Sequence, residues 1–359
     1  MDNRKKHDTS MDFLRVLAIT LVIASHAKIL EQGGVGNCIF FALSGFFVAM
    51  PFKKDGELAF LSFKEWLFYY GKRLLRVLPA YYAYLLFVVY FTGTIFVTAL
   101  DGYGSLLLHM CFFKVGGHLW FIQQEMAFFL ICPVILCLTA ILKKTLKKVI
   151  TKDWQISLLQ ALFVAILAYL FYRFLHINLY GNNSIVAFMP QRIMTGMVAA
   201  YIYQALKASL PKLGETKGFQ ILTDIYMVFF VLFCILSSEW ILSRINPAFT
   251  GYYIGWENPL LVLNLTCLAL ILLASSGNCL IKKFASHPLI GFLASLSFSM
   301  YLFHFPFLSL LGSGSRARTF LLVYLVTVGF AYLVKKGIEE PVQKLFKKRR
   351  PKENKVLIA

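Results

Sequence analysis

Long apolar segments dominate the chain, and polar residues collect in the short connections between them. A helix that spans a membrane needs about 20 mostly apolar residues, because the hydrocarbon core of a bilayer is about 30 Å thick. Ten segments fit this length, the second and eighth narrowly: Phe13–Leu30, Asn37–Phe52, Leu78–Leu100, Leu119–Leu142, Ile156–Leu175, Ile185–Leu206, Phe219–Ser243, Pro259–Ser275, Pro288–Leu311 and Thr319–Lys335. The pattern therefore predicts an all-α, polytopic membrane protein with ten transmembrane helices.

The positions of Lys and Arg test this count, because short cytoplasmic loops are enriched in both residues. If the N-terminus is cytoplasmic, most of the 36 basic residues fall in every second connection: residues 53–77, 143–152, 207–217, 282–283 and 335 onward. This alternation predicts that both termini are cytoplasmic. The first apolar run carries Arg15 and His26 and lacks a small-residue cleavage site, so we interpret it as a retained helix rather than a signal peptide.

Composition agrees with a membrane protein. The 359 residues are 59% hydrophobic and 15% charged, against about half and about a quarter in soluble domains. The net charge of +19 is explained by topology and by contact with anionic lipid, so we expect no nucleic-acid partner. The seven cysteines form no CxxC pair, and we expect no metal. We interpret residues 1–345 as one ten-helix domain and 346–359 as a basic cytoplasmic tail.

The first predicted helix carries two ionisable residues where a bilayer makes them costly. At 100° and 1.5 Å per residue, Arg15 and His26 share a face to within about 20° and lie about 16.5 Å apart along the axis. An intramembrane ionisable residue is by default a functional hypothesis. The structural alternative is that both side chains reach out to the headgroups at opposite ends of the helix. The sequence leaves the two interpretations about even.

Other predicted helices add polar residues of the same kind. Glu125 lies about 10 Å into the fourth helix and needs a partner, for which His26 or an arginine is the candidate. Ser44 precedes Gly45 in the second helix, where close packing explains a small residue adequately. Tyr301 and His304 lie three residues apart in the ninth helix and therefore face the same way.

Two arginines lie just before the third predicted helix, at the expected cytoplasmic surface. Arg73 and Arg76 are three residues apart, so both guanidiniums share one face. Guanidinium groups bind phosphate through paired hydrogen bonds, so this pair could hold a phosphorylated cytosolic ligand. Ordinary positive-inside anchoring explains the same two residues.

Taken in order, these motifs resemble those of the acyltransferase 3 family of integral-membrane acyltransferases. The similarity covers residues 11–342. Its elements are Arg15 with His26, Phe41-Ala42-Leu43-Ser44-Gly45-Phe46, Arg73-x-x-Arg76-x-x-Pro79-x-Tyr81-Tyr82, His118-Leu119-Trp120-Phe121 with Glu125 and Pro133, Ser297-Phe298-Ser299-Met300-Tyr301-Leu302-Phe303-His304, and Glu340-Pro341. Each motif alone is weak, and six in the same order on ten helices form a specific pattern.

The resemblance implies transfer of an acyl group, usually acetyl, from cytosolic acyl-CoA to a hydroxyl of a glycan beyond the membrane. It implies that His26 and Arg15 are essential and that Arg73 and Arg76 serve the acyl-CoA. Acetyl-CoA is then the donor, and the partners are membrane lipids and a glycan or lipid-linked glycan such as lipopolysaccharide O-antigen or exopolysaccharide. Some relatives carry an added esterase-like domain. We expect a stand-alone enzyme in the inner (plasma) membrane.

Elementary chemistry gives these residues roles. A sugar hydroxyl is a poor nucleophile, so we expect neutral His26 to remove its proton as general base. Glu125 could orient the ring, and Arg15 could contact the acyl-CoA or stabilise developing oxyanion charge. An acyl-histidine intermediate stays open. We assign substrate binding to four further residues: Ser44, Trp120, Tyr301 and His304.

A proton-coupled transporter or flippase is the alternative function, because ten helices with buried ionisable residues also fit a carrier. Such carriers often contain inverted repeats and broken midplane helices, and the sequence shows no matching halves.

Overall fold

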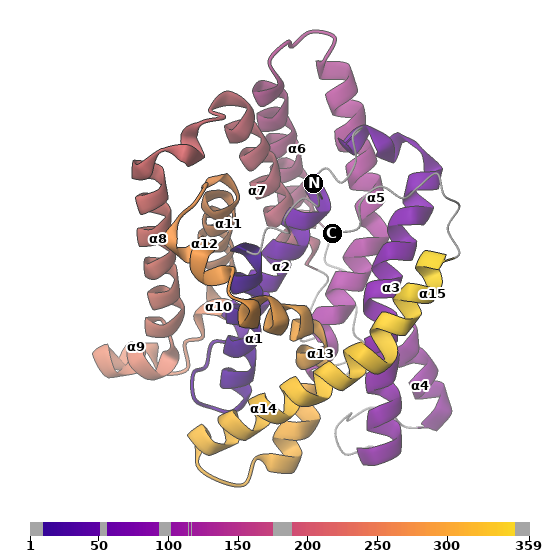
Figure 1. Cartoon of the computed structure of the whole chain (residues 1–359), viewed down its shortest axis with the longest axis vertical. Coiled ribbons are helices and arrows are strands. Elements are labelled where there is room, and N and C mark those ends of the chain that lie inside the picture. The colour runs from indigo at the N-terminus through magenta and orange to yellow at the C-terminus, as the bar shows by residue number, and fades with distance from the viewer. Residues whose placement is uncertain are drawn as a thin grey trace.

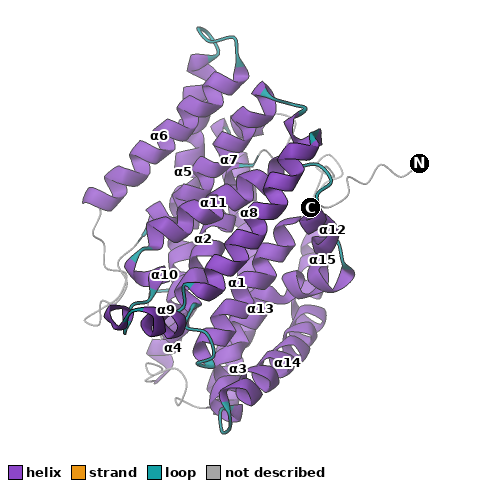
Figure 2. Ribbon diagram, turned by 90° about the vertical axis from the view of Figure 1, so that its left-hand side faces the viewer, coloured by secondary structure: helices purple, strands orange, loops and turns teal. Residues whose placement is uncertain are grey.

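All regular elements in the part of the chain that the structure describes are helical (Figure 2). The structure is a computed structural model that describes residues 10–50, 56–92, 102–113, 115, 117–174 and 189–348. Its α-helices are α1 (Ser10–His26), α2 (Gly33–Ala49), α3 (Phe63–Phe87), α4 (Gly102–Met110), α5 (Trp120–Leu146), α6 (Asp153–Phe174), α7 (Pro190–Ser209), α8 (Lys217–Leu236), α9 (Glu239–Ile245), α10 (Ile254–Glu257), α11 (Pro259–Ser275), α12 (Leu280–Ala285), α13 (Pro288–Leu311), α14 (Arg316–Val334) and α15 (Glu340–Lys348). The predicted all-α fold is confirmed.

Within the described residues, each of the ten predicted apolar segments overlaps at least one helix, while positions 51–52, 93–100, 175 and 185–188 of these segments lie outside the described residues. Six helical stretches are long and apolar enough to cross a membrane: Phe63–Tyr90, Gly117–Leu146, Asp153–Phe174, Lys217–Leu236, Pro288–Leu311 and Arg316–Phe346. The helices α2 and α11 are apolar but shorter. The protein is therefore a multi-pass membrane protein, while the count of ten crossings and the cytoplasmic termini stay predictions. Residues 1–9 and most of the predicted tail, from 349 onward, lie outside the described residues.

Two predicted boundaries are wrong. The third helix begins at Phe63 rather than Leu78, so Arg73 and Arg76 lie inside α3 instead of before it. Lysine and arginine interrupt a hydropathy pattern but are good helix formers, which is why apolarity alone places the start too late. The seventh segment also divides, since α8 ends at Leu236 and α9 begins at Glu239.

The helices α1 and α2 occupy the centre of the bundle, with α7 packed on α2 and α13 packed on α1 (Figure 1). Glycines bring α2 and α7 into backbone contact. A Cβ atom on Gly45 would overlap the carbonyl oxygen of Ile193, and one on Gly196 would overlap that of Ala42. Small residues permit this close approach of membrane helices. The contact fixes the position of the α2 residues that face the site.

Candidate active site

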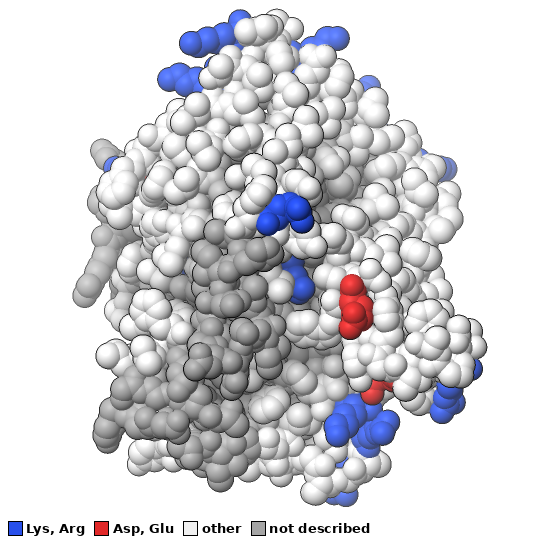
Figure 3. Space-filling model, turned by 180° about the vertical axis from the view of Figure 1, so that it is seen from behind, with Lys and Arg blue, Asp and Glu red and all other residues white. Residues whose placement is uncertain are grey.

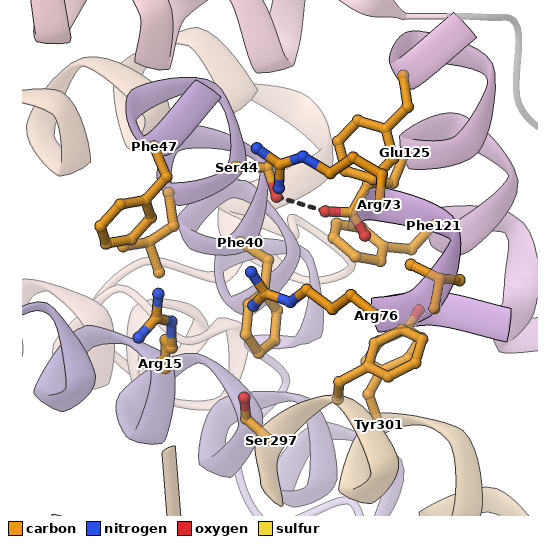
Figure 4. Close-up of a pocket in the computed structure, with 14 residues that line it drawn as sticks. Arg15, Phe40, Ser44, Phe47, Arg73, Arg76, Phe121, Glu125, Ser297 and Tyr301 are labelled. Carbon is orange, nitrogen blue, oxygen red and sulfur yellow. Dashed lines mark hydrogen bonds between the residues drawn. The ribbon is translucent and has the colours of Figure 1, made fainter. Parts of the chain in front are cut away.

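Five helices enclose a cavity of about 60 Å³ in the middle of the bundle (Figure 4). This volume exceeds the roughly 15 Å³ that one water molecule needs. Its lining combines arginines with aromatic rings from α1, α2, α3, α5 and α13: Arg15, Phe40, Leu43, Ser44, Phe47, Arg73, Arg76, Val77, Phe121, Glu125, Phe129, Ser297, Phe298 and Tyr301. Six of the nine predicted site residues therefore lie together, although they come from distant parts of the sequence.

Arg15 enters the cavity from α1 and is held from two sides. Its guanidinium forms an ion pair with Asp12, one turn earlier on the same helix. Its Cζ also lies 4.7 Å from the ring centroid of Phe47, within the range of a cation–π contact. The side chain is thus positioned inside the bundle, which removes the alternative that Arg15 only reaches out to the headgroups.

The helix α3 carries Arg73 and Arg76 into the same cavity. The Cζ of Arg73 lies 4.8 Å from the ring of Phe129 and 5.5 Å from that of Tyr69, so this guanidinium rests between two aromatic faces. Within the described part of the chain, neither Arg73 nor Arg76 forms an ion pair. The two guanidiniums keep hydrogen-bond donors for an anionic ligand.

Ser44 and Glu125 face each other across the cavity. The Ser44 hydroxyl donates to a carboxylate oxygen of Glu125 at 2.5 Å (Figure 4). The sequence leaves His26 or an arginine as the partner of Glu125; the structure gives its carboxylate a hydrogen bond from Ser44 and places it in the same cavity as Arg76, with which it interacts electrostatically. Three arginines and one glutamate line the cavity, so its charge is predominantly positive.

A second polar cluster lies toward the end of α1. The Nδ1 atom of His26 is 2.7 Å from Nε2 of His304, and the two rings lie edge to edge with centroids 4.9 Å apart and planes within 6°. The Nδ1 atom of His304 is 2.7 Å from the carbonyl oxygen of Tyr301, on the preceding turn of α13. His304 is fully buried, whereas His26 is partly exposed. His26 is thus held by another histidine rather than by the expected carboxylate.

The neighbouring His118 is anchored to a carbonyl group that a proline leaves free. Pro306 has no N–H group to donate to the carbonyl of Leu302, four residues earlier in α13. The Nε2 atom of His118 lies 3.0 Å from that oxygen and takes the place of the missing donor. The Tyr301 hydroxyl donates to the His118 carbonyl at 2.5 Å. These contacts join α13 to the start of α5.

Tyr301 connects the cavity to the histidine cluster. Its ring lines the cavity beside Phe40 and Phe121, and its carbonyl accepts from His304. His26 is not among the residues that line the cavity. The two side chains of α1 that are expected to be catalytic therefore lie in different parts of the site: Arg15 in the cavity and His26 in the adjoining histidine cluster. Trp120 belongs to neither place and packs against Trp256 and Phe41.

Sequence reasoning missed some partners and had weak signals for others. Phe47 and Phe129 hold arginines, and nothing in their local sequence marks them for that task. Asp12 lies three residues before Arg15, a spacing at which helical side chains meet, so this ion pair had a signal in the sequence. The sequence gives His118 only as part of a motif. Pro306 is the signal that could have located its partner, because a proline inside α13 leaves the Leu302 carbonyl without a helical donor. Across the described residues, no group of three or more His, Cys, Asp or Glu side chains is placed to hold a metal ion. That the protein uses no metal stays a prediction.

Basic side chains also reach the middle of one broad face that is otherwise largely uncharged (Figure 3). Charged groups among apolar helices, a cationic cavity and an adjoining histidine cluster form the candidate site. The family of acyltransferase domains known as acyltransferase 3 matches residues 8–336. The chain belongs to this family, whose description favours an enzyme over the carrier alternative.

Curated relatives agree with this assignment. Three proteins named "Putative O-acetyltransferase", from Staphylococcus aureus strains COL, MSSA476 and MRSA252, are each 23% identical over 378 residues, covering 95% of this chain. The chain spans 58% of the length of these relatives. No solved structure matches the chain.

Proposed function

We propose that the protein transfers an acyl group, in the first place acetyl, from cytosolic acyl-CoA to a hydroxyl of an extracytoplasmic glycan. Lipopolysaccharide O-antigen and exopolysaccharide are the proposed acceptors, and the inner membrane is the proposed location. One observation carries the proposal. The cationic cavity contains Arg15 of α1, and Tyr301 connects this cavity, by way of His304, to the partly exposed His26 of the same helix.

The cavity supports the donor half of the reaction. Acyl-CoA carries several phosphate groups, and guanidiniums bind phosphate oxygens in pairs. Arg73 and Arg76 form no ion pair within the described residues, so binding an anion would not require breaking one. Arg15 is partly neutralised by Asp12 and lines the same cavity from α1, where it would contact the thioester end or stabilise oxyanion charge.

The histidine cluster supports the acceptor half. Removal of the hydroxyl proton by a positioned base typically contributes about 10²- to 10⁴-fold to the rate. His26 is accessible from its exposed side and held at Nδ1 by His304, which leaves Nε2 to take the proton. In the overall step the hydroxyl oxygen bonds to the acyl carbon, the thioester C–S bond breaks, and the proton leaves with the CoA sulfur as a thiol.

The test measures acyl transfer by the full chain in proteoliposomes, with isotopically labelled acetyl-CoA outside and a glycan acceptor inside, or the reverse orientation. His26→Ala and Arg15→Ala should abolish labelling of the glycan while protein levels stay normal. His287→Asn is the matched control, because it removes an imidazole elsewhere and keeps a side-chain acceptor at the start of α13. Full labelling by the His26 variant would refute the general-base assignment, and no labelling by the wild type with any glycan would refute the acceptor class.

A further inference from the structure

Three hydrogen-bonding groups form an unbroken series from α13 to the exposed end of α1. The carbonyl of Tyr301 faces Nδ1 of His304, and Nε2 of His304 faces Nδ1 of His26, each across 2.7 Å. A carbonyl oxygen can only accept, so Nδ1 of His304 must carry a hydrogen. In a neutral His304 the Nε2 atom then carries no hydrogen and can only accept. Nδ1 of His26 must therefore be the donor in the hydrogen bond between the two rings. The remaining nitrogen of His26, Nε2, is left without a hydrogen.

We propose that His304 is a positioning residue that fixes His26 as the Nδ1–H tautomer and thereby presents Nε2 as the proton acceptor. This inference rests on the proposed function, in which His26 is the general base. It gives His304 the orienting task expected of Glu125, in place of the substrate binding first assigned to it. The hydrogen bond made by one ring nitrogen decides what the other nitrogen can do.

The surroundings of His304 suit this task. Its side chain is fully buried, so water does not compete for either ring nitrogen. The His118 ring lies edge-on with its centroid 5.1 Å away, and His118 is itself tied to the Leu302 carbonyl. The nearly coplanar arrangement with His26, at 6° between ring planes, aligns the two ring nitrogens for their hydrogen bond.

A neutral orienting group has a chemical consequence. When Nε2 of His26 receives the acceptor proton, the ring becomes an imidazolium and its Nδ1–H bond to His304 becomes charge-assisted and stronger. His304 gains and loses no proton in this cycle, because its own hydrogen stays on Nδ1 and is donated to the Tyr301 carbonyl oxygen. The proton returns from Nε2 of His26 to the departing thiolate.

The experiment reads the tautomer directly, independently of activity. In full-length protein with ¹⁵N-labelled histidine, reconstituted in phospholipid bilayers, solid-state NMR should show His26 protonated at Nδ1 and bare at Nε2. The His26 signals are assigned by their loss in His26→Ala. In His304→Ala the Nδ1–H form should give way to a mixture of tautomers, and His287→Asn should leave the His26 signals unchanged. A wild-type His26 protonated at Nε2 alone would overturn the proposal.

A rescue variant separates positioning from folding. In His304→Gln the amide N–H can donate to the Tyr301 carbonyl and the amide oxygen can accept from His26. We expect His304→Ala to lower kcat at least 100-fold with little change in KM for acetyl-CoA, and His304→Gln to recover the tautomer and at least 10-fold of the rate. Failure of His304→Gln to restore the tautomer in a folded protein counts against positioning. If the wild-type protein shows the Nδ1–H tautomer of His26 but transfers no acyl group, the proposed function is refuted while the positioning role of His304 stands.

Discussion

At the scale of single residues, the cavity depends on arginines whose partners are aromatic rings rather than acids. Arg73 lies over Phe129 and Tyr69, and Arg15 lies over Phe47. A planar guanidinium can stack on a ring and still offer in-plane donors to a phosphate, which a lysine ammonium cannot do. The identity of the side chain therefore matters here as much as its charge.

Replacing Arg73 or Arg76 by lysine should weaken donor binding although the charge is kept. Hydrogen bonds to charged groups contribute about 1.5–3 kcal/mol, so loss of one of a pair predicts a rise in KM for acetyl-CoA of about 10-fold or more. Steady-state kinetics of the reconstituted enzyme measures this. Lys64→Ala, on the exposed side of the same helix, should leave KM unchanged. An unchanged KM in both lysine variants would place the donor elsewhere.

Motifs predicted which residues gather, but not how they pair. Arg15, Ser44, Arg73, Arg76, Glu125 and Tyr301 line one cavity as their intramembrane polarity indicated. The pairings Ser44–Glu125 and His26–His304 join residues 81 and 278 positions apart. Such contacts depend on helix rotation and depth, which hydropathy does not record. That is why a carboxylate was expected beside His26 and a histidine is found there.

At the scale of elements, the crossing of α2 and α7 sets the geometry of the site, because α2 carries Ser44 next to Gly45. Both glycines at the crossing face a backbone carbonyl of the other helix. The sequence identified Ser44-Gly45 as a place for close packing, and the structure confirms that interpretation. The partner helix could not be inferred, since many apolar segments offer small residues.

Gly45→Ala and Gly196→Ala should each destabilise the protein, because the new methyl group overlaps backbone atoms that cannot rotate away. Overpacking of this kind typically costs about 1–3 kcal/mol or more. Thermal unfolding in detergent, followed by size-exclusion profiles, measures the loss. Gly329→Ala is the control, because nothing lies within 4 Å of the added carbon. Unchanged melting temperatures in both crossing variants would show that α2 and α7 separate more easily than the structure indicates.

At the scale of the whole molecule, the arrangement of charge predicts its orientation. Reporter fusions after residues 148 and 212 should be cytoplasmic, and a fusion after residue 313 should be extracytoplasmic, because Lys and Arg cluster in the first two connections. The described structure gives the helices but contains no membrane, so sidedness rests on this rule. A cytoplasmic signal from residue 313 would contradict the predicted topology and with it the outward position of His26.

The Glu31 carboxyl, which lies outside the spanning helices, should make stability depend on pH. Burial and the neighbouring Glu239 carboxyl raise the pKa of Glu31 in the segment after α1, although Arg316 opposes the shift. An acid whose pKa is raised by folding stabilises the fold below its unfolded pKa and loses that contribution as pH rises through the folded value. The wild type should therefore lose stability relative to Glu31→Gln above about pH 4.3.

Melting temperatures of both proteins between pH 4 and 7 measure this difference, with Glu257→Gln as an exposed control. Parallel curves for the wild type and Glu31→Gln would rule out the carboxyl pair as a source of pH dependence.

One residue serves both halves of the site. The ring of Tyr301 forms part of the wall around the arginines, while its carbonyl fixes the series that ends at His26. A displacement of α13 at this turn would change the shape of the cavity and the orientation of His26 together. If the proposed roles hold, a ligand that shifts this turn of α13 on entering the cavity would also reorient His304 and, through it, His26.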